Sequence, residues 1–517
     1  MRPILQGQDH ARMREAFDRA LPARLNMARQ VCDEWAAREP ERVAILEHGG
    51  DAVSFGALAL LSRRVQAALE VRGVTRGDRV GVLLSQSPLC AAAHVACWRM
   101  GAISVPLFKL FREDALRTRL DDSGARVVVT DDEGAEMLVS FDLDVVTDLP
   151  GVPSDAPCAD TGPDDPAIII YTSGTTGKPK GALHGHRVLT GHLPGVEISH
   201  DLLGQAGDVL WTPADWAWIG GLFDVAMPGL AIGVPVVAAR MRKFSVGECL
   251  DICRDNGVRN VFFPPTALRM LKAEGAALPG LRSVASGGEP LGAEMLAWGR
   301  EAFGLVINEF YGQTECNMVA SSCAALYPPR PGFIGRPVPG HEVAVIDAEG
   351  RRTEAEGDVA VRRGSASMML EYWNNPAETA AKFRGDWLVT GDRGIFEGEE
   401  LRFVGREDDV ITSAGYRIGP AEIEDCLLTH PGVATCGVVG KPDPLRTEIV
   451  KAYVVRKPGA DVAADELRAW VRERLATYSC PREIQFLDAL PMTVTGKVIR
   501  KELKRRAAEE APECREP

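Results

Sequence analysis

Short apolar runs alternate with helical stretches through the first 300 residues of the chain. Residues 80–84 and 127–130 are apolar and rich in β-branched side chains, as in buried strands, and residues 88–100 between them have a helical pattern. Further strands are predicted at residues 209–212, 234–239, 259–263 and 281–286, with helices between them. This alternation predicts an α/β fold with a mostly parallel sheet covered on both faces.

From about residue 330 the pattern changes to shorter strands, such as residues 342–346 and 357–362, which indicate a barrel-like subdomain. After a polar stretch near residues 405–409, the chain predicts a small α+β unit with helices at 420–430 and 462–475 and strands at 433–439 and 450–456. A length of 517 residues exceeds one compact core. We therefore predict two domains, residues 1–407 and residues 408–517.

Bulk properties exclude several classes of protein. A net charge of −13 argues against nucleic acid as the main partner. Residues 1–14 lack the apolar core of a secretory signal, and the longest apolar stretch, residues 225–239, is too short for a membrane span and is interrupted by prolines and glycines. The 12 cysteines form no Cys-x-x-Cys pair, so buried free thiols and a reducing, cytoplasmic location are predicted.

A glycine-rich segment, YTSGTTGKPKG at residues 171–181, follows the strand-like residues 167–170. Its glycines allow tight turns with converging N–H groups, its hydroxyls add donors, and its lysines add charge, which together suit a polyphosphate. The spacing is not that of a Walker A loop. An exposed polar turn is the alternative, but the whole chain has only 12 lysines among its 59 basic residues. Two lysines in one turn favour the phosphate interpretation.

Other polar segments follow in order along the chain. Residues 287–291 (GGEPL) end a strand and open a helix, and residues 309–315 (EFYGQTE) follow a strand expected at 305–308. Residues 390–392 (TGD) place a carboxylate at an expected strand–turn junction. Taken singly, these segments are also compatible with a common turn, an N-capped helix and an Asx turn. A long run at residues 405–424 and the segment PMTVTGKVIR at 491–500 complete the series.

The whole series resembles the AMP-forming adenylating superfamily of acyl-CoA synthetases, luciferases and adenylation domains, over about residues 28–505. The resemblance is greatest to the short- and medium-chain acyl-CoA synthetases. It implies an AMP-forming acid–CoA ligase that uses ATP, Mg²⁺ and CoA, and a C-terminal domain that is mobile about a hinge at Asp408.

The resemblance assigns Lys497, Thr314 and Glu315 to catalysis, with Glu315 holding Mg²⁺. Lys497 would bind the carboxylate oxygen and the α-phosphate, and Tyr311 would stack on adenine. Asp392 would accept hydrogen bonds from the ribose hydroxyls. The residues implied to bind ATP or AMP are Thr172, Ser173, Gly174, Thr175, Thr176, Gly177, Lys178, Lys180, Gly288, Glu289, Pro290, Glu309, Tyr311, Gly312, Gln313, Thr314, Asp392, Arg406 and Arg417.

A second set of residues is implied to bind CoA. Ala414, Gly415 and Tyr416 would flank the pantetheine channel, and Arg446 would bind a CoA phosphate. Arg482 is a further candidate for the same role. For Arg446 and Arg482, a solvated basic surface is an equally good interpretation.

The acyl pocket is implied by the segment 211–221 and by three glycines. The resemblance places Trp216, Trp218, Phe223, Gly220, Gly287 and Gly312 in its wall. Acetate-specific relatives carry larger residues at the three glycine positions, so a deeper tunnel is expected here. Such a tunnel favours a medium-chain, branched or aryl acid. Plain core packing of the aromatic residues is the alternative.

Three other functions share these motifs. An amino-acid-adenylating enzyme and a luciferase-like enzyme would use a non-CoA acceptor, and an inactive paralogue would only bind ligands. The expected partners are therefore small molecules, namely a carboxylic acid, ATP and CoA. Acylation of Lys497 would remove its charge, so regulation by a protein acyltransferase or deacylase is a further hypothesis.

Overall fold

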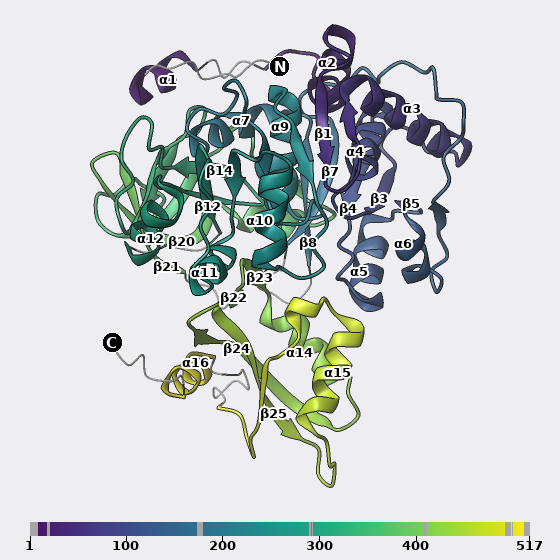
Figure 1. Cartoon of the computed structure of the whole chain (residues 1–517). Helices are drawn as coiled ribbons and strands as arrows, with labels where there is room; N and C mark the ends of the chain where they lie inside the picture. The colour runs from purple at the N-terminus through teal and green to yellow at the C-terminus, as the bar shows by residue number, and fades with distance from the viewer. Residues whose placement is uncertain are drawn as a thin grey trace. The chain divides into compact units, whose positions relative to one another are not determined.

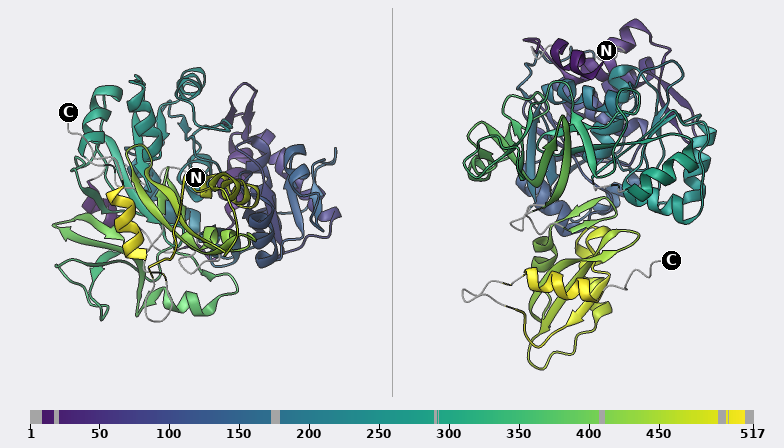
Figure 2. Two further views of the ribbon diagram at one scale, coloured as in Figure 1. Left: turned by 90° about the horizontal axis from the view of Figure 1, so that it is seen from below. Right: turned by 90° about the vertical axis from the view of Figure 1, so that its left-hand side faces the viewer.

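The computed structural model describes residues 9–17, 21–172, 179–288, 291, 293–406, 411–491, 498 and 500–510 (Figures 1 and 2). The chain divides into two compact units. The larger unit comprises Met1–Lys109, Ser123–Ile170 and Gly181–Gly405. The smaller unit comprises Leu110–Asp122, Tyr171–Lys180 and Arg406–Pro517.

One sheet of the larger unit contains the strand that precedes the glycine-rich segment. In the described part of the chain it has seven strands, in the order β18 (Glu371–Tyr372), β8 (Lys180–Gly185), β7 (Pro166–Thr172), β4 (Ile103–Pro106), β3 (Arg79–Leu83), β5 (Val127–Thr130) and β6 (Asp144–Val146). The pairs β7–β4, β4–β3, β3–β5 and β5–β6 are parallel, as the β-α alternation predicted.

The second sheet carries most of the predicted site. Its path through the described residues is β16 (Val343–Ile346), β17 (Gly357–Arg362), β20 (Trp387–Glu397), β21 (Glu400–Arg406), β15 (Phe333–Pro337), β14 (Asn317–Ser321), β13 (Ile307–Gln313), β12 (Ser283–Gly287), β11 (Asn260–Phe262), β9 (Leu210–Trp211), β10 (Val236–Ala238), β1 (Val43–Glu47) and β2 (Ala52–Ser54). A short strand, β19 (Phe383–Arg384), pairs with β20. Strands β13 to β1 are parallel, whereas β13–β14, β14–β15 and β16–β17 are antiparallel.

Consecutive residues on the central strands of this sheet face two different cores. Val236 and Phe262 belong to one buried cluster, whereas their neighbours Val237 and Phe263 belong to another. Because side chains alternate between the faces of a strand, both faces of this sheet are buried, which explains the continuously apolar strands in the sequence.

Helices cover these sheets. The larger unit contains α1 (His10–Ala16), η1 (Arg29–Asp33), α2 (Glu34–Arg38), α3 (Phe55–Val71), α4 (Pro88–Met100), α6 (Asp132–Met137), α7 (Arg187–Ser199), α8 (Ile219–Gly221), η2 (Leu222–Ala226), α9 (Met227–Ile232), α10 (Val246–Asp255), α11 (Pro265–Ala273), α12 (Ala293–Phe303) and α13 (Pro376–Ala381). The local sequence determines where several of these helices begin and end. Ser87 accepts a hydrogen bond from the Cys90 amide at the start of α4, and Gly101 ends that helix in the left-handed conformation.

The smaller unit has its own sheet and cores. Within its described residues, β23 (Tyr416–Ile418), β22 (Ile411–Ser413), β25 (Thr447–Arg456) and β24 (Val433–Asp443) form a path, and β26 (Glu483–Phe486) pairs with β25. Its helices are α5 (Glu113–Ser123), α14 (Pro420–Leu428), α15 (Ala464–Arg474), η3 (Thr477–Ser479) and α16 (Arg500–Glu509). Ile423, Val438 and Leu467 lie in one core of this unit.

The predicted α/β class is confirmed, and the helix predicted at 420–430 and the strand at 357–362 lie within a residue or two of their predicted bounds. The boundary predicted between residues 407 and 408 lies outside the described residues and stays a prediction. Two strand ends were wrong. Strand β13 continues through Gln313 instead of ending at residue 308, and residues 390–392 lie inside β20 instead of at a turn. In the part of the chain that the structure describes, no helix is long and apolar enough to cross a membrane.

Candidate functional site

The residues of the 309–315 motif form one side of a tight hairpin. Strand β13 ends at Gln313, residues 314–316 form the turn, and β14 begins at Asn317, whose φ is +57°. Gly312 pairs with Met318 across this hairpin. A Cβ atom at Gly312 would lie 1.9 Å from the Asn317 carbonyl oxygen, so the hairpin closes only because position 312 has no side chain.

The carboxylate of Asp392 is the hydrogen-bond acceptor that fixes this hairpin. Its Oδ2 accepts from the Tyr311 hydroxyl at 2.6 Å and from Gln313 Nε2 at 2.9 Å. Gln313 also donates to the Thr390 carbonyl at 2.8 Å. Burial, followed by the neighbouring Asp392 charge, raises the pKa of Tyr311 well above its usual range, so this hydroxyl remains a donor. The structure thus brings together the predicted site residues Tyr311, Gln313 and Asp392.

Glu315 lies in the hairpin turn and is largely buried. Its Oε1 accepts from the Tyr372 hydroxyl at 2.6 Å, and its carbonyl accepts from the Met369 amide at 2.8 Å. The predicted catalytic Thr314 precedes it in the same turn. Mg²⁺ takes carboxylate oxygens together with substrate phosphates and waters, and Glu315 has the donor chemistry that this ion prefers. Tyr372 is a neighbour of Glu315 that the sequence motifs do not indicate.

The predicted adenine turn, residues 287–291, contacts the first residue of the 309–315 motif, Glu309. The Leu291 amide donates to Glu309 Oε1 at 3.3 Å, and Gly288 in this turn has a φ of +96°. Glu309 is 7% exposed, and burial raises its pKa from 4.5 to about 7. The carboxyl group is therefore partly protonated near neutral pH, in a place where adenine is expected.

Several predicted residues fall outside the structural description. Residues 173–178 of the glycine-rich segment, Glu289, Pro290, the hinge candidate Asp408 and the candidate lysine Lys497 lie outside the described residues. At the ends of the glycine-rich segment, the Thr172 hydroxyl donates to the Lys180 carbonyl at 3.4 Å. Arg406 ends β21 and Arg417 lies in β23, and only their backbones are described.

The candidate CoA residues converge in the smaller unit. Ala414 and Gly415 form the left-handed turn between β22 and β23, with φ values of +55° and +79°, and the Ala414 amide donates to the Arg446 carbonyl at 3.1 Å. Burial and the Arg482 cation lower the pKa of Arg446, so two cationic side chains lie near each other. Tyr416 stacks on Tyr478 with ring centroids 4.2 Å apart. Tyr478 is an aromatic residue of this group that motif analysis missed.

The candidate acyl-pocket residues meet around two phenylalanines. A Cβ at Gly220 would lie 2.9 Å from the Trp218 ring and 3.2 Å from Phe262, and one at Gly287 would lie 2.5 Å from Phe310. Phe262 and Phe310 contact each other, with ring centroids 5.1 Å apart. Trp216 and Phe223 belong to the same buried cluster.

The three glycines each lie against neighbouring atoms, and the depth of the acyl pocket stays a prediction. The space beside Gly220 and Gly287 is filled by aromatic rings, and that beside Gly312 is filled by the backbone of Asn317. The sequence motifs assigned no role to Phe262 or Phe310. Phe310 lies in the EFYGQTE segment, two residues before Gly312, whereas Phe262 lies in β11, outside every predicted site segment.

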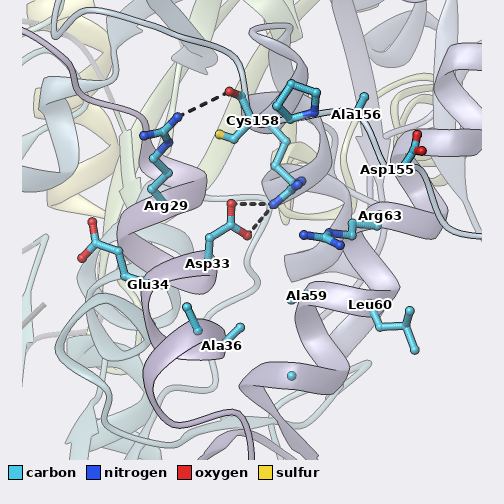
Figure 3. Close-up of a pocket in the computed structure, with 14 residues that line it drawn as sticks. Arg29, Asp33, Glu34, Ala36, Ala59, Leu60, Arg63, Asp155, Ala156 and Cys158 are labelled. Carbon is cyan, nitrogen blue, oxygen red and sulfur yellow. Dashed lines mark hydrogen bonds and ion pairs between the residues drawn. The ribbon is translucent and has the colours of Figure 1, made fainter.

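A cavity of about 700 Å³ lies elsewhere in the larger unit (Figure 3). Arg99, one of its lining residues, is buried and donates to both oxygens of Asp33 at 2.5 Å, while Arg29 donates to the Cys158 carbonyl. None of the residues that line it belongs to the predicted site.

Two protein-family models match the chain. The model of the AMP-binding enzyme family matches residues 32–373, and that of the AMP-binding enzyme C-terminal domain matches residues 422–497. The chain belongs to the AMP-binding enzyme family. The acetyl-coenzyme A synthetase of Bacillus subtilis (strain 168) is 35% identical over 468 residues, which cover 83% of this chain and 81% of that protein.

Two other proteins are similar to this chain over most of its length. Human acyl-coenzyme A synthetase ACSM4, a mitochondrial protein, is 34% identical over 538 residues, covering 94% of this chain and 91% of its own. The structure of the amide bond synthetase McbA from Marinactinospora thermotolerans superposes with a TM-score of 0.82 at 28% identity, covering 93% of this chain and 99% of its own. The expectations of an adenylate-forming ligase with ATP, Mg²⁺ and CoA as its cofactors and cosubstrates are confirmed by this membership.

The close contact at Gly312 generates a stability prediction. We expect Gly312→Ala to lower the free energy of unfolding by about 3 kcal/mol or more, because the methyl group would collide with backbone. Gly247→Ala is the matched control, since its Cβ would meet only the Ser245 hydroxyl at 4.0 Å inside a helix. We expect that control to be neutral or stabilising by up to ~1 kcal/mol. Urea denaturation measures both, and equal midpoints for the two variants would contradict the packing at Gly312.

Burial of Glu309 generates a pH prediction. Its pKa in the folded state, about 7, lies above the ordinary 4.5, so its contribution to stability is complete below pH 4.5 and is lost as the pH rises to 7. A glutamine at position 309 cannot ionise. We therefore expect the free energy of unfolding of Glu309→Gln, relative to that of the original protein, to increase by about 3 kcal/mol between pH 5 and pH 8. Urea denaturation at both pH values measures this, with exposed Glu301→Gln as the control. Parallel pH profiles for the Glu309 variant and the original protein would refute the prediction.

Proposed function

We propose that this chain converts a carboxylic acid, ATP and CoA to acyl-CoA, AMP and pyrophosphate through an acyl-adenylate. We further propose that the acid is medium-chain, branched or aryl, rather than acetate. The observation that carries the first proposal is the hydrogen-bonded arrangement of Tyr311, Gln313 and Asp392 beside Glu315, in a chain that belongs to this family.

The chemistry requires activation of the acid before thioester formation. A carboxylate is a poor electrophile, so its oxygen first attacks the α-phosphorus of ATP and expels pyrophosphate. The CoA thiol then attacks the carbonyl carbon of the mixed anhydride, loses its proton and expels AMP. Negative charge accumulates on the phosphates in the first step, and electrostatic stabilisation of that charge is the main catalytic contribution.

Each proposed role follows from the chemistry of the residue. Asp392 would accept hydrogen bonds from the ribose, and the ring of Tyr311 would lie against adenine while its hydroxyl is held by Asp392. Glu315 would hold Mg²⁺, which offsets phosphate charge when bound. Lys497 would bring a cation to the α-phosphate during adenylation. Rotation of the C-terminal domain about Asp408 would then withdraw Lys497 and present the CoA channel for thioester formation.

The substrate size is supported by the aromatic cluster. Gly220 and Gly287 lie in segments assigned to the pocket. The rings of Trp218 and Phe262 lie next to Gly220, and the ring of Phe310 lies next to Gly287. Large flat side chains bury large apolar groups favourably. A cytoplasmic location also remains a proposal, because the human relative is named as mitochondrial.

A non-CoA acceptor is a second candidate, favoured by the similarity to an amide bond synthetase at a TM-score of 0.82. In that case an amine would attack the acyl-adenylate in place of the thiol. The pair of arginines beside the stacked tyrosines in the smaller unit favours CoA, because cations and aromatic rings suit a phosphorylated nucleotide. AMP release that needs an amine and does not respond to CoA would favour the second candidate.

Substrate preference tests the acyl-pocket proposal. We expect AMP release across acids of two to twelve carbons, branched acids and aryl acids to give kcat/KM at least ~100-fold higher for the best larger acid than for acetate. Phe310→Leu should raise kcat/KM for acids bulkier than the best one by about tenfold, because it removes a ring from the wall.

The matched control is Phe303→Leu, which removes a similarly buried phenylalanine from the other core of the larger unit. It should leave the order of preference unchanged. If acetate is the best acid, or if both leucine variants shift preference alike, the assignment of Phe310 to the acyl pocket is wrong.

A further inference from the structure

A buried carboxylate and imidazole form a pair next to Phe223 of the candidate acyl wall. His192 on α7 hydrogen-bonds through Nε2 to Asp224 Oδ1 at 2.8 Å. The imidazole is completely buried, and the Asp224 side chain is 12% exposed. Neither residue belongs to the family motifs found in the sequence, and an ionisable pair of this kind is unusual inside an apolar cluster.

The partners of the imidazole indicate which of its nitrogens carries a proton. His192 Nδ1 accepts a hydrogen bond from the Met318 amide at 3.5 Å, so we assign the proton to Nε2. The imidazole therefore donates to Asp224. The carboxylate is an acceptor toward His192, and its second oxygen is also an acceptor.

The pair connects the two segments assigned to the acyl pocket. Asp224 directly follows Phe223 in the π-helical turn η2, and the Phe223 ring lies edge-on to His192 with centroids 6.3 Å apart. Met318, the donor to His192, pairs with Gly312 across the hairpin. Short π-helical segments occur often at functional sites, because the extra residue redirects side chains.

The hydrogen bonding of Asp224 is incomplete. A carboxylate accepts about four hydrogen bonds, and buried polar atoms are almost always paired. In the described part of the chain, Asp224 has no hydrogen-bond partner other than His192. Its side chain retains 12% exposure, whereas Phe223 and Val225 on either side are fully buried. The carboxylate therefore has an accessible acceptor next to Phe223.

We propose that Asp224, positioned by His192, selects acids that carry a hydroxyl or amino group on the acyl chain. A hydrogen-bond donor on the substrate would complete the hydrogen bonding of the carboxylate. A purely apolar chain would leave a buried acceptor unpaired, and such mismatches discriminate strongly between substrates. This inference rests on the proposed acyl-CoA ligase activity and narrows its substrate class.

A purely structural role makes a different prediction. If the pair only attaches η2 to α7, changing Asp224 would lower stability but would not change the preference between acids of equal size. Substitution with asparagine separates the two roles. Its oxygen can still accept from His192, while its amide nitrogen places a donor where the carboxylate had an acceptor.

The experiment compares acids matched in size that end in a hydroxyl, amino, methyl or keto group, over several chain lengths, using CoA-dependent AMP release by the full chain. We expect the original protein to favour the acid that ends in a hydroxyl group, or the one that ends in an amino group, over the methyl analogue at least ~10-fold in kcat/KM. In Asp224→Asn this ratio should fall at least ~10-fold, and the keto acid should gain over the methyl acid. Comparison of the acids that end in a hydroxyl group with those that end in an amino group shows which hydrogen-bond donor the site binds.

His200→Gln is the matched control. His200 is an equally buried imidazole at the end of the same helix, hydrogen-bonded to Ser283, and should leave both ratios within about twofold. Absence of any donor preference in the original protein overturns the proposal even if Asp224→Asn fails to fold. Unchanged ratios in a folded Asp224→Asn also overturn it. If no acid of any kind supports AMP release, the proposed function itself has failed.

Discussion

The shared acceptor at Asp392 is the interaction on which the rest of the site depends. One buried carboxylate oxygen holds both Tyr311 and Gln313, and so joins β13 to β20 across the larger sheet. Hydrogen bonds to a charged acceptor in a low-dielectric interior are strong and directional. These bonds hold β13 in place at both residues, and the absence of a side chain at Gly312 lets the hairpin close. The hairpin turn then places Glu315 within hydrogen-bond distance of the Tyr372 hydroxyl.

The same hairpin links the residues proposed to bind the nucleotide to those proposed to line the acyl pocket. Alternate residues on β13 serve different purposes, because Tyr311 and Gln313 reach Asp392 while Phe310 enters the aromatic cluster with Phe262. The opposing strand carries Met318, which contacts the buried His192. A single antiparallel pair therefore carries, on its opposite faces, the residues that we propose for phosphate chemistry and those that we propose for acyl recognition.

The sequence could predict the fold class and the order of motifs, because strand periodicity and glycine-rich turns are local properties. Local rules also misplaced the ends of two strands, since polar residues such as those at 309–313 look like a loop until Asp392 provides their partner. The contacts of Gly220, Gly287 and Gly312 depend on residues distant in sequence or on hairpin geometry. Phe262, Tyr478 and the His192–Asp224 pair were missed because their significance comes from tertiary contacts.

We propose that a site organised around Asp392 activates a carboxylic acid with ATP. Acid-dependent exchange of pyrophosphate into ATP, measured for the original protein and for Asp392→Asn, tests it most directly. We expect exchange only when an acid is present, and at least a ~100-fold lower rate in the asparagine variant, as for loss of a group that positions reactants. Exchange that needs no acid, or that continues at the same rate in a folded Asp392→Asn protein, would contradict it.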